Sequence, residues 1–397
     1  MAADSDGRRA IGLDLYGLAQ QRPGTCNRIS PMTTSILRRR VAVPPPRHFM
    51  WFFVLGCSVL YAVADMIPQI QQVIRQFPDT GWWGLDADLV FQASRRWLDG
   101  QSAYADPSFV YTPLAVLLGV PATLVPREYV LLAYALFKVI LAAVVALWLS
   151  RGSWLAVLGV LTFLPLINDV APGNFMVPIT AAMALATFGQ ERRRSGVPLG
   201  LIAAAIPKPL LAPYFVWLLF RRRKSAEGAF IAGAVVTGAA AVVAGPGMYL
   251  DWLHNLAQGN RFMWAWPGNS GVSAYLPGLT VPIAILVMAL SVIVVLRAHE
   301  NRSLAWVLAA GILVAPYAGP LAGLPLLLTL PILRPWPRLY AIVLLQPVTT
   351  LTVALAGLLA MCLAPPCAIV DGEVGTAKAR GSPALAVLGP EASLADD

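Results

Sequence analysis

The chain has 397 residues, of which 58% are hydrophobic and 12% are charged, and its mean hydropathy is +0.67. Soluble proteins carry about 25% charged residues, so this composition excludes a soluble enzyme and indicates a polytopic membrane protein. The formal net charge of +9 comes from short Arg and Lys clusters between apolar runs, which mark topology and predict no nucleic-acid partner.

The N-terminal region, residues 1–48, is predicted to be cytoplasmic and mostly disordered. It has weak periodicity and ends in a basic cluster formed by Arg38, Arg39, Arg40 and Arg47. The apolar run 49–70 then has the length of a first membrane span, which places the next segment, residues 71–108, on the outer face. We therefore expect a multi-pass protein of the plasma membrane with a cytoplasmic N-terminus.

The polar segment 71–108 contains an amphipathic helix that begins at Asp86. Leu89, Ala93 and Trp97 share one face of this helix, which is predicted to lie flat on the outer membrane surface. Gly100 ends the helix, and Tyr104 packs back against it.

Asp86 has two interpretations at this position. It is either a capping residue favoured by the helix dipole, or a general base that deprotonates an acceptor hydroxyl at the membrane face. Asp88 is the reserve base, and the Asp86-x-Asp88 pair is weak evidence for a metal site. Hydrolase and metalloenzyme motifs are missing from the sequence, so no metal-ligand residues are assigned and no cofactor is expected, while a metal requirement is left open.

The rest of the chain up to residue 363 is predicted to be the transmembrane catalytic domain, which starts at residue 49. It is all-α, with roughly ten to twelve membrane segments that include re-entrant or broken helices. After the first span, the apolar segments are 109–125, 129–149, 154–167, 175–188, 199–220, 229–250, 276–296, 304–318, 321–333 and 339–362. Residues 364–397 are expected to form a disordered tail.

The segment 199–220 is predicted to be two half-helices that meet at Lys208, because Pro207 and Pro209 flank this lysine. A lysine at membrane depth requires an anionic partner or a water-filled cavity. Lys208 is therefore either paired with a local carboxylate such as Asp169 or a clamp for a phosphate group, and Lys138 is its rival for the phosphate role.

The segment 251–275 is rich in Trp and polar residues and is predicted to line the same outer-facing site. Arg261, Asn269 and Ser270 are candidates to donate hydrogen bonds to a phosphate or to sugar hydroxyls. Trp264 and Trp266 either stack on a sugar or belong to an interfacial aromatic belt.

Several of these residues form a pattern that resembles glycosyltransferase family 87 of the GT-C superfamily, which uses polyprenyl-phosphate sugars. The opening signature comprises Asp86, Phe91, Ala93, Leu98-x-Gly100, Tyr104 and Tyr111-x-Pro113. The later motifs follow in the family's order and are Gly173-Asn174, Lys208-Pro209, Arg221 to Lys224 and Gly268-Asn269-Ser270. The resemblance extends over residues 80–345, and it departs from the family where Tyr317 is not followed by a His-Tyr pair.

This resemblance implies a GT-C-like membrane enzyme of the bacterial cell envelope that moves mannose from polyprenyl phosphate to a glycolipid or glycan on the outer leaflet, with inversion. An arabinofuranosyltransferase with the same mechanism and a lipid transporter or flippase are the alternatives. The predicted roles are base for Asp86, with Asp88 in reserve, and phosphate binding for Lys208 and Arg261. Sugar or acceptor binding is assigned to Asn174, Asn269, Ser270, Tyr104 and Tyr111. The expected partners are the lipid-linked donor, the acceptor and membrane lipids.

Overall fold

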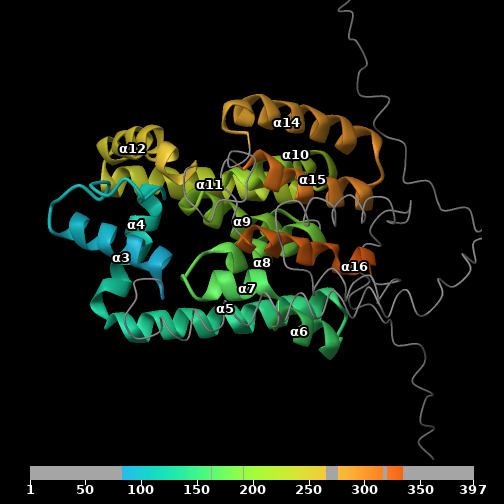
Figure 1. Cartoon of the computed structure of the whole chain (residues 1–397), viewed down its shortest axis with the longest axis horizontal. Helices are drawn as coiled ribbons and strands as arrows, with labels where there is room; N and C mark the ends of the chain where they lie inside the picture. Colours follow the sequence, from blue (N-terminus) through green and yellow to red (C-terminus); the bar gives the residue numbers. More distant parts are fainter. Residues whose placement is uncertain (1–82, 162, 191, 265–275, 316–319, 334–397) are drawn as a thin grey trace, which may run out of the picture. The chain divides into compact units, whose positions relative to one another are not determined.

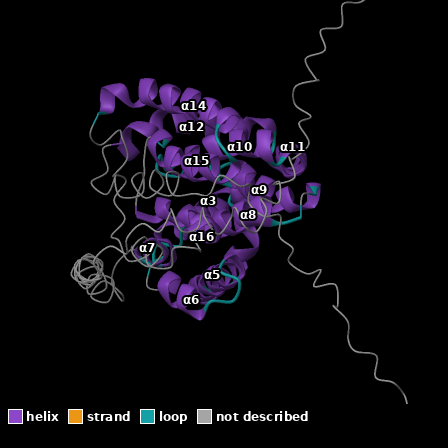
Figure 2. Cartoon of the chain, turned by 90° about the vertical axis from the view of Figure 1, so that its right-hand side faces the viewer, coloured by secondary structure: helices purple, strands orange, loops and turns teal. Residues whose placement is uncertain are grey.

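The computed structural model describes residues 83–161, 163–190, 192–264, 276–315 and 320–333, which all belong to one compact unit, Cys57–Asp397. These residues form helices joined by turns, and there is no strand among them (Figure 1, Figure 2). The predicted disordered ends, the first span and the last apolar segment lie outside the described residues.

The helices follow one another with few residues between them. The first group is α3 (Leu85–Leu98), α4 (Pro113–Gly119), η1 (Val120–Leu124), α5 (Arg127–Leu149), α6 (Trp154–Leu161), α7 (Leu164–Val170) and α8 (Met176–Phe188). The second group is α9 (Arg193–Ala205), η2 (Pro209–Leu211), α10 (Ala212–Arg221), α11 (Arg223–Ala244) and α12 (Pro246–Trp264). The last group is η3 (Pro277–Leu279), α14 (Thr280–Arg297), α15 (Glu300–Val314), η4 (Pro320–Thr329) and α16 (Leu330–Leu333).

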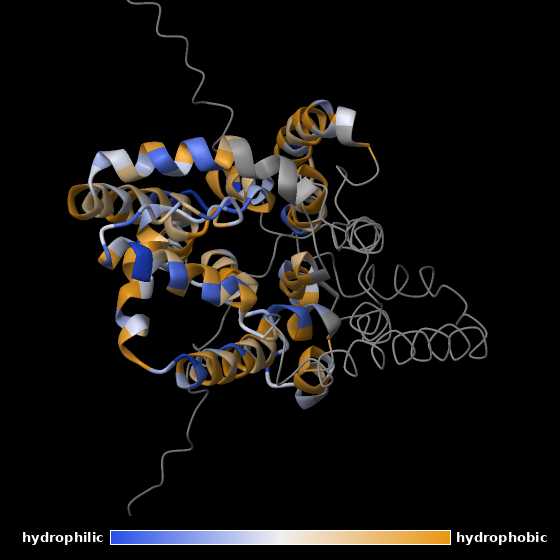
Figure 3. Ribbon diagram, turned by 60° about the vertical axis from the view of Figure 1, so that its left-hand side comes forward, coloured by the Kyte–Doolittle hydropathy of each residue, from blue (hydrophilic) through white to orange (hydrophobic). Residues whose placement is uncertain are grey.

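Among the described residues, α5, α11 and α14 are long and apolar enough to cross a membrane. Hydrophobic residues dominate many of the helices (Figure 3). On α5, for example, Leu136 and Ile140 are 55% and 62% exposed. Exposed apolar side chains around long helices indicate contact with lipid. The predicted all-α membrane fold is therefore confirmed, whereas the number of ten to twelve segments stays a prediction.

Helices α9 and α11 pack closely because glycines line their contact. A Cβ atom on Gly196 of α9 would lie 1.7 Å from the carbonyl oxygen of Ser225, and one on Gly228 of α11 would lie 1.8 Å from that of Arg193. Small residues allow helix backbones to approach in this way in membrane proteins. This contact anchors α9, whose C-terminal end leads into the site described below.

The predicted helix break at Lys208 is confirmed. Helix α9 ends at Ala205, Lys208 has extended backbone angles (φ −106°, ψ 125°), and η2 begins at Pro209. The hydroxyl of Thr112 donates hydrogen bonds to the carbonyl oxygens of Ala204 and Ala205 at 2.7 and 3.0 Å. The backbone groups released by the break thus find partners, which makes the break tolerable inside an apolar protein.

Candidate active site

The first turn of α3 is attached to the turn between α7 and α8. The amide of Asp86 donates to the carbonyl oxygen of Pro172 at 2.7 Å, and that of Gly84 donates to Ala171 at 2.9 Å. Gly173 has a positive φ of 75°, and a Cβ atom there would lie 2.9 Å from the Cβ of Ala87. Glycine is thus required at residue 173 both by its backbone angle and by the close approach of α3.

The carboxylate of Asp86 faces this turn and does not cap its helix. Gly84 is the N-cap residue of α3, and no side chain makes a capping hydrogen bond there. The capping interpretation of Asp86 is therefore wrong. Instead, the Oδ2 atom of Asp86 accepts a hydrogen bond from the Nδ2 atom of Asn174 at 2.6 Å, across 88 residues of sequence.

Asn174 connects this carboxylate to the cation at the helix break. Its Oδ1 atom accepts hydrogen bonds from the Nζ atom of Lys208 at 3.2 Å and from the backbone amide of Phe175 at 2.7 Å. The side-chain amide of Asn174 therefore lies between the carboxylate of Asp86 and the ammonium group of Lys208. A carboxylate and an ammonium group are held close to each other without neutralising each other through direct contact.

The surroundings of Asp86 oppose its ionisation. Burial raises the pKa of the Asp86 carboxyl above its ordinary value, although the positive charge of Lys208 and the hydrogen bond from Asn174 act in the opposite direction. A carboxylate whose pKa is raised is a stronger base than an exposed aspartate and is typical of proton-transfer sites.

The lysine of α5 and the aspartate of α7 form a second pair behind this site. The Nζ atom of Lys138 lies 3.4 Å from the Oδ2 atom of Asp169, and both side chains are completely buried. The hypothesis that Asp169 pairs with Lys208 is therefore wrong, because Lys138 occupies that place and Lys208 binds Asn174. Lys208 is thus the lysine linked to the Asp86 carboxylate, through the side chain of Asn174.

Asp88 lies in a different environment from Asp86. Its carboxylate accepts two hydrogen bonds from Arg127, from Nε at 2.7 Å and from Nη2 at 2.5 Å. Arg127 also donates to the carbonyl oxygen of Trp83, at 2.8 Å. This bidentate ion pair attaches α3 to the start of α5, and it leaves Asp86 as the better placed base.

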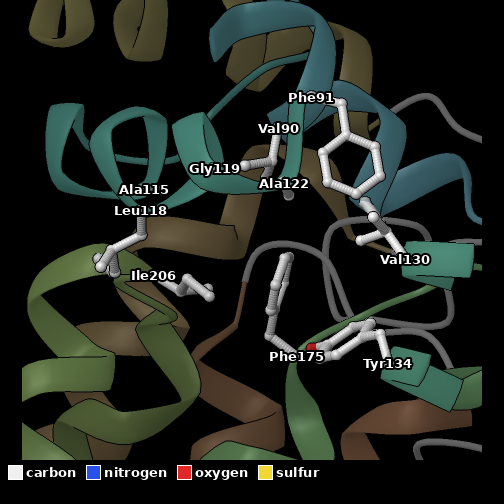
Figure 4. A pocket seen from close by; sticks show the side chains of 12 residues that line it. Val90, Phe91, Ala115, Leu118, Gly119, Ala122, Val130, Tyr134, Phe175 and Ile206 are labelled. Carbon is white, nitrogen blue, oxygen red and sulfur yellow. The ribbon is translucent and has the colours of Figure 1, made fainter. Parts of the chain in front are cut away.

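An apolar cavity of about 210 Å³ lies among the elements that carry this site. Its walls come from α3, α4, η1, α5 and the ends of α8 and α9, and Figure 4 shows Phe91, Phe175, Tyr134 and Val130 around it. The lining residues are Ala87, Val90, Phe91, Ala115, Leu118, Gly119, Ala122, Val130, Tyr134, Phe175, Ala205 and Ile206. Two of the lining residues are sequence neighbours of the polar site, because Ala87 follows Asp86 and Phe175 follows Asn174. The size and the apolar lining of the cavity suit an apolar group.

Comparison with known proteins places this arrangement in a family. The model of glycosyltransferase family 87 matches residues 109–318, which is just over half of the chain. The chain belongs to glycosyltransferase family 87. Searches of curated proteins and of solved structures gave no match.

Membership of family 87 makes the protein a membrane glycosyltransferase, so the resemblance seen in the sequence is confirmed and a transferase is favoured over a lipid transporter. The matched region includes Asn174 and Lys208, and it begins after α3, which carries Asp86. The tertiary structure brings the carboxylate of α3 to the matched region, through the hydrogen bond from Asn174.

Of the remaining predicted site residues of this family 87 protein, two are buried tyrosines and three lie wholly or partly outside the described residues. Tyr104 and Tyr111 are 8% and 7% exposed, and the Tyr104 hydroxyl donates to the carbonyl oxygen of Tyr111 at 3.0 Å, so their first role is to pack the segment after α3. Arg261 lies on α12, and its side chain is outside the described part, as are Asn269 and Ser270 entirely.

Sequence reasoning did not assign roles to Arg127 and Tyr134 of α5. The Tyr134 hydroxyl donates to the carbonyl oxygen of Asn174 at 3.0 Å, and its ring centroid lies 4.6 Å from the Nζ atom of Lys138. The one available signal is the spacing of Tyr134 and Lys138, which places both polar groups on one face of an apolar helix.

Proposed function

We propose that the protein transfers mannose from a polyprenyl-phosphate donor to a glycolipid or glycan acceptor on the outer face of the plasma membrane. The observation that carries this proposal is the joint placement of the Asp86 carboxylate, the Lys208 ammonium group and the apolar cavity. A lipid-linked sugar phosphate needs a base for the acceptor, a cation for the phosphate and an apolar space for the chain. Asp86, Lys208 and the cavity match these needs.

In the proposed reaction, the acceptor hydroxyl gives its proton to Asp86 while its oxygen attacks the anomeric carbon of the donor. The new glycosidic bond forms as the bond between that carbon and the phosphate oxygen breaks, and the electron pair leaves with the polyprenyl phosphate. Attack from the opposite side inverts the anomeric configuration. Lys208, with Arg261 of α12 as its proposed companion, stabilises the leaving phosphate.

Asn174 orients the base in this proposal. Its amide nitrogen holds one oxygen of Asp86 at 2.6 Å, which leaves the other oxygen of the carboxylate to accept the proton. Both polar atoms of the Asn174 side chain are engaged with the protein, so we now assign it to positioning Asp86 and Lys208 rather than to binding the sugar. Asn269 and Ser270 keep their proposed role in binding the sugar or the acceptor.

The lipid chain of the donor is proposed to enter the cavity beside α3. A volume of about 210 Å³ is below the range of roughly 300–1,000 Å³ of complete ligand pockets, so the cavity suits one part of the donor. Its lining is dominated by Ala, Val, Leu, Ile and Phe side chains, which fit an isoprenoid chain and not a nucleotide. The donor head would then lie at Asp86 and Lys208.

The test uses the full chain, purified and inserted into liposomes with a mixed glycolipid extract. Labelled polyprenyl-phosphate mannose and its arabinose counterpart are added separately, and loss of donor and appearance of labelled glycolipid are measured. We expect turnover of the mannose donor that falls about 10²- to 10⁴-fold in Asp86→Asn. Asp99→Asn is the matched control, because this exposed carboxylate ends the same helix.

The outcomes of this test separate the alternatives. Turnover of the arabinose donor alone identifies an arabinofuranosyltransferase with the same site. Equal rates in Asp86→Asn and the parent protein overturn the assignment of the base. Turnover of neither donor overturns the proposed substrate class.

A further inference from the structure

We propose that Lys138 of α5, buried behind the site, is a positioning residue that fixes the turn from Asp169 to Asn174 and thereby aims the Asn174 amide at Asp86. The inference rests on the proposed role of Asp86 as the base. It gives a function to the completely buried pair of Lys138 and Asp169, which the reaction itself does not use.

The ammonium group of Lys138 binds three backbone carbonyl oxygens of this turn. Its Nζ atom donates to Asp169 at 2.5 Å, to Asn174 at 3.1 Å and to Val170 at 3.4 Å. A lysine side chain has three donors, so all of them are directed at one short stretch of backbone. Converging carbonyl oxygens repel one another, and a central cation holds them together.

Asp169 fixes the same turn from its other side. Its Oδ1 atom accepts the backbone amide of Met176 at 2.7 Å, where α8 begins, and its carbonyl oxygen accepts the amide of Asn174 at 2.9 Å. The charge of its carboxylate offsets that of Lys138. The turn is therefore bound at both ends and in its centre, with Asn174 as its last residue.

Tyr134 adds a further contact from the same face of α5. Its hydroxyl donates to the carbonyl oxygen of Asn174, which also accepts from Lys138. The backbone of Asn174 is thus held by two side chains of one rigid helix, while its side chain holds Asp86. A shift of the turn would lengthen the 2.6 Å hydrogen bond between Asn174 and Asp86. Misplacement of a reacting group by about 1 Å can reduce the rate about 10²-fold.

A paired substitution separates this role from simple charge neutralisation. Lys138→Met alone leaves Asp169 as an uncompensated buried charge, so a failure to fold is expected and uninformative. Lys138→Met combined with Asp169→Asn removes both charges, and the asparagine Oδ1 atom still accepts the amide of Met176. Replacing a buried ion pair by neutral groups is often neutral for stability, so the double variant should fold, which its unfolding temperature checks.

We expect the double variant to lose kcat about 10- to 100-fold, while its KM for the donor stays within about threefold, because the phosphate and lipid contacts are retained. The matched control is Arg222→Met combined with Glu300→Gln. It neutralises another, largely buried ion pair, with an N to O distance of 3.0 Å, between the α10–α11 junction and α15. Its kcat should remain that of the parent protein.

Two results overturn the proposal: a parental kcat in the Lys138 double variant, or an equal loss of kcat in the control pair. An electron cryomicroscopy structure of the double variant gives a readout that needs no activity. We expect the Asn174 amide to have moved out of hydrogen-bond distance of Asp86, and an unchanged turn contradicts the positioning role. If the parent protein transfers no sugar, the proposed function fails, while the structure still decides whether Lys138 fixes the turn.

Discussion

Replacing Asn174 by alanine removes the hydrogen bond that favours the ionised form of Asp86, and it should shift the acid side of the pH–rate profile to higher pH. Burial already raises the pKa of Asp86, while Asn174 and Lys208 lower it. Without the Asn174 amide, the carboxyl group holds its proton up to a higher pH. A general base works only when deprotonated, so activity is lost at the acid end.

The size of the effect follows from the contact. A hydrogen bond to a charged group contributes about 1.5–3 kcal/mol, and the short distance of 2.6 Å indicates a strong one. About 1.4 kcal/mol corresponds to a factor of ten. On the acid limb of the profile, the ionised fraction of Asp86 should therefore fall roughly 10- to 100-fold.

The assay is kcat/KM for sugar transfer in liposomes, measured across the acid and neutral range for the parent protein and the variant. Asn255→Ala is the matched control, because Asn255 is buried to a similar extent and donates a 2.6 Å hydrogen bond to the carbonyl oxygen of Phe109. It should lower stability without moving the acid limb. If Asn174→Ala leaves the limb in place or moves it to lower pH, Lys208 has replaced the amide and the reasoning is refuted.

Further predictions concern the cation, the second aspartate, the cavity and the helix contact. Lys208→Met should reduce transfer at least about 10²-fold at neutral pH, since the phosphate loses its fixed cation, and restored activity in Lys208→Arg would show that charge is what matters. Asp88→Asn should change turnover by less than about fivefold, because its partly exposed ion pair with Arg127 anchors α3; a loss equal to that of Asp86→Asn contradicts this. Ala122→Phe should fill the cavity and raise KM about tenfold for a donor with a long lipid chain, but not for a donor with a very short one. Equal effects on the KM of the two donors argue against a lipid chain in the cavity. Gly196→Ala should destabilise the fold by about 1–3 kcal/mol in denaturant unfolding. Gly238→Ala on α11 is the control and should not, because a Cβ atom there meets nothing within 4 Å. Equal stabilities of the two variants contradict the close contact of α9 and α11.

Local sequence patterns predicted several elements correctly because the physical cause is local. The apolar spacing after Asp86 predicted the amphipathic helix, and the structure has α3 from Leu85 to Leu98, followed by Gly100 with a positive φ of 71°. The two prolines around Lys208 predicted the break between α9 and η2, since proline removes a donor and restricts the residue before it.

The partners of the charged residues were not predictable in the same way. Asp169 was a candidate partner for Lys208, but the fold brings it to Lys138, and Lys208 binds Asn174. Similarly, the position of Asp86 at the start of α3 was compatible with a capping role. In the structure its carboxylate instead accepts a hydrogen bond from Asn174, in the turn after α7, which local capping rules do not predict. Which of several charges meet depends on how the helices pack, and sequence spacing does not contain that information.

The sequence by itself determined the membrane class, the family and the chemical groups available to the site, because hydropathy, helix periodicity and proline breaks act over a few residues. Only the tertiary structure decided that Asp86 and Lys208 share Asn174, that Arg127 binds Asp88, and that an apolar cavity forms between α3, α4 and α5. These contacts join residues 34 to 88 positions apart. Close packing of the glycine-lined helices and the turn held by Lys138 brings them together.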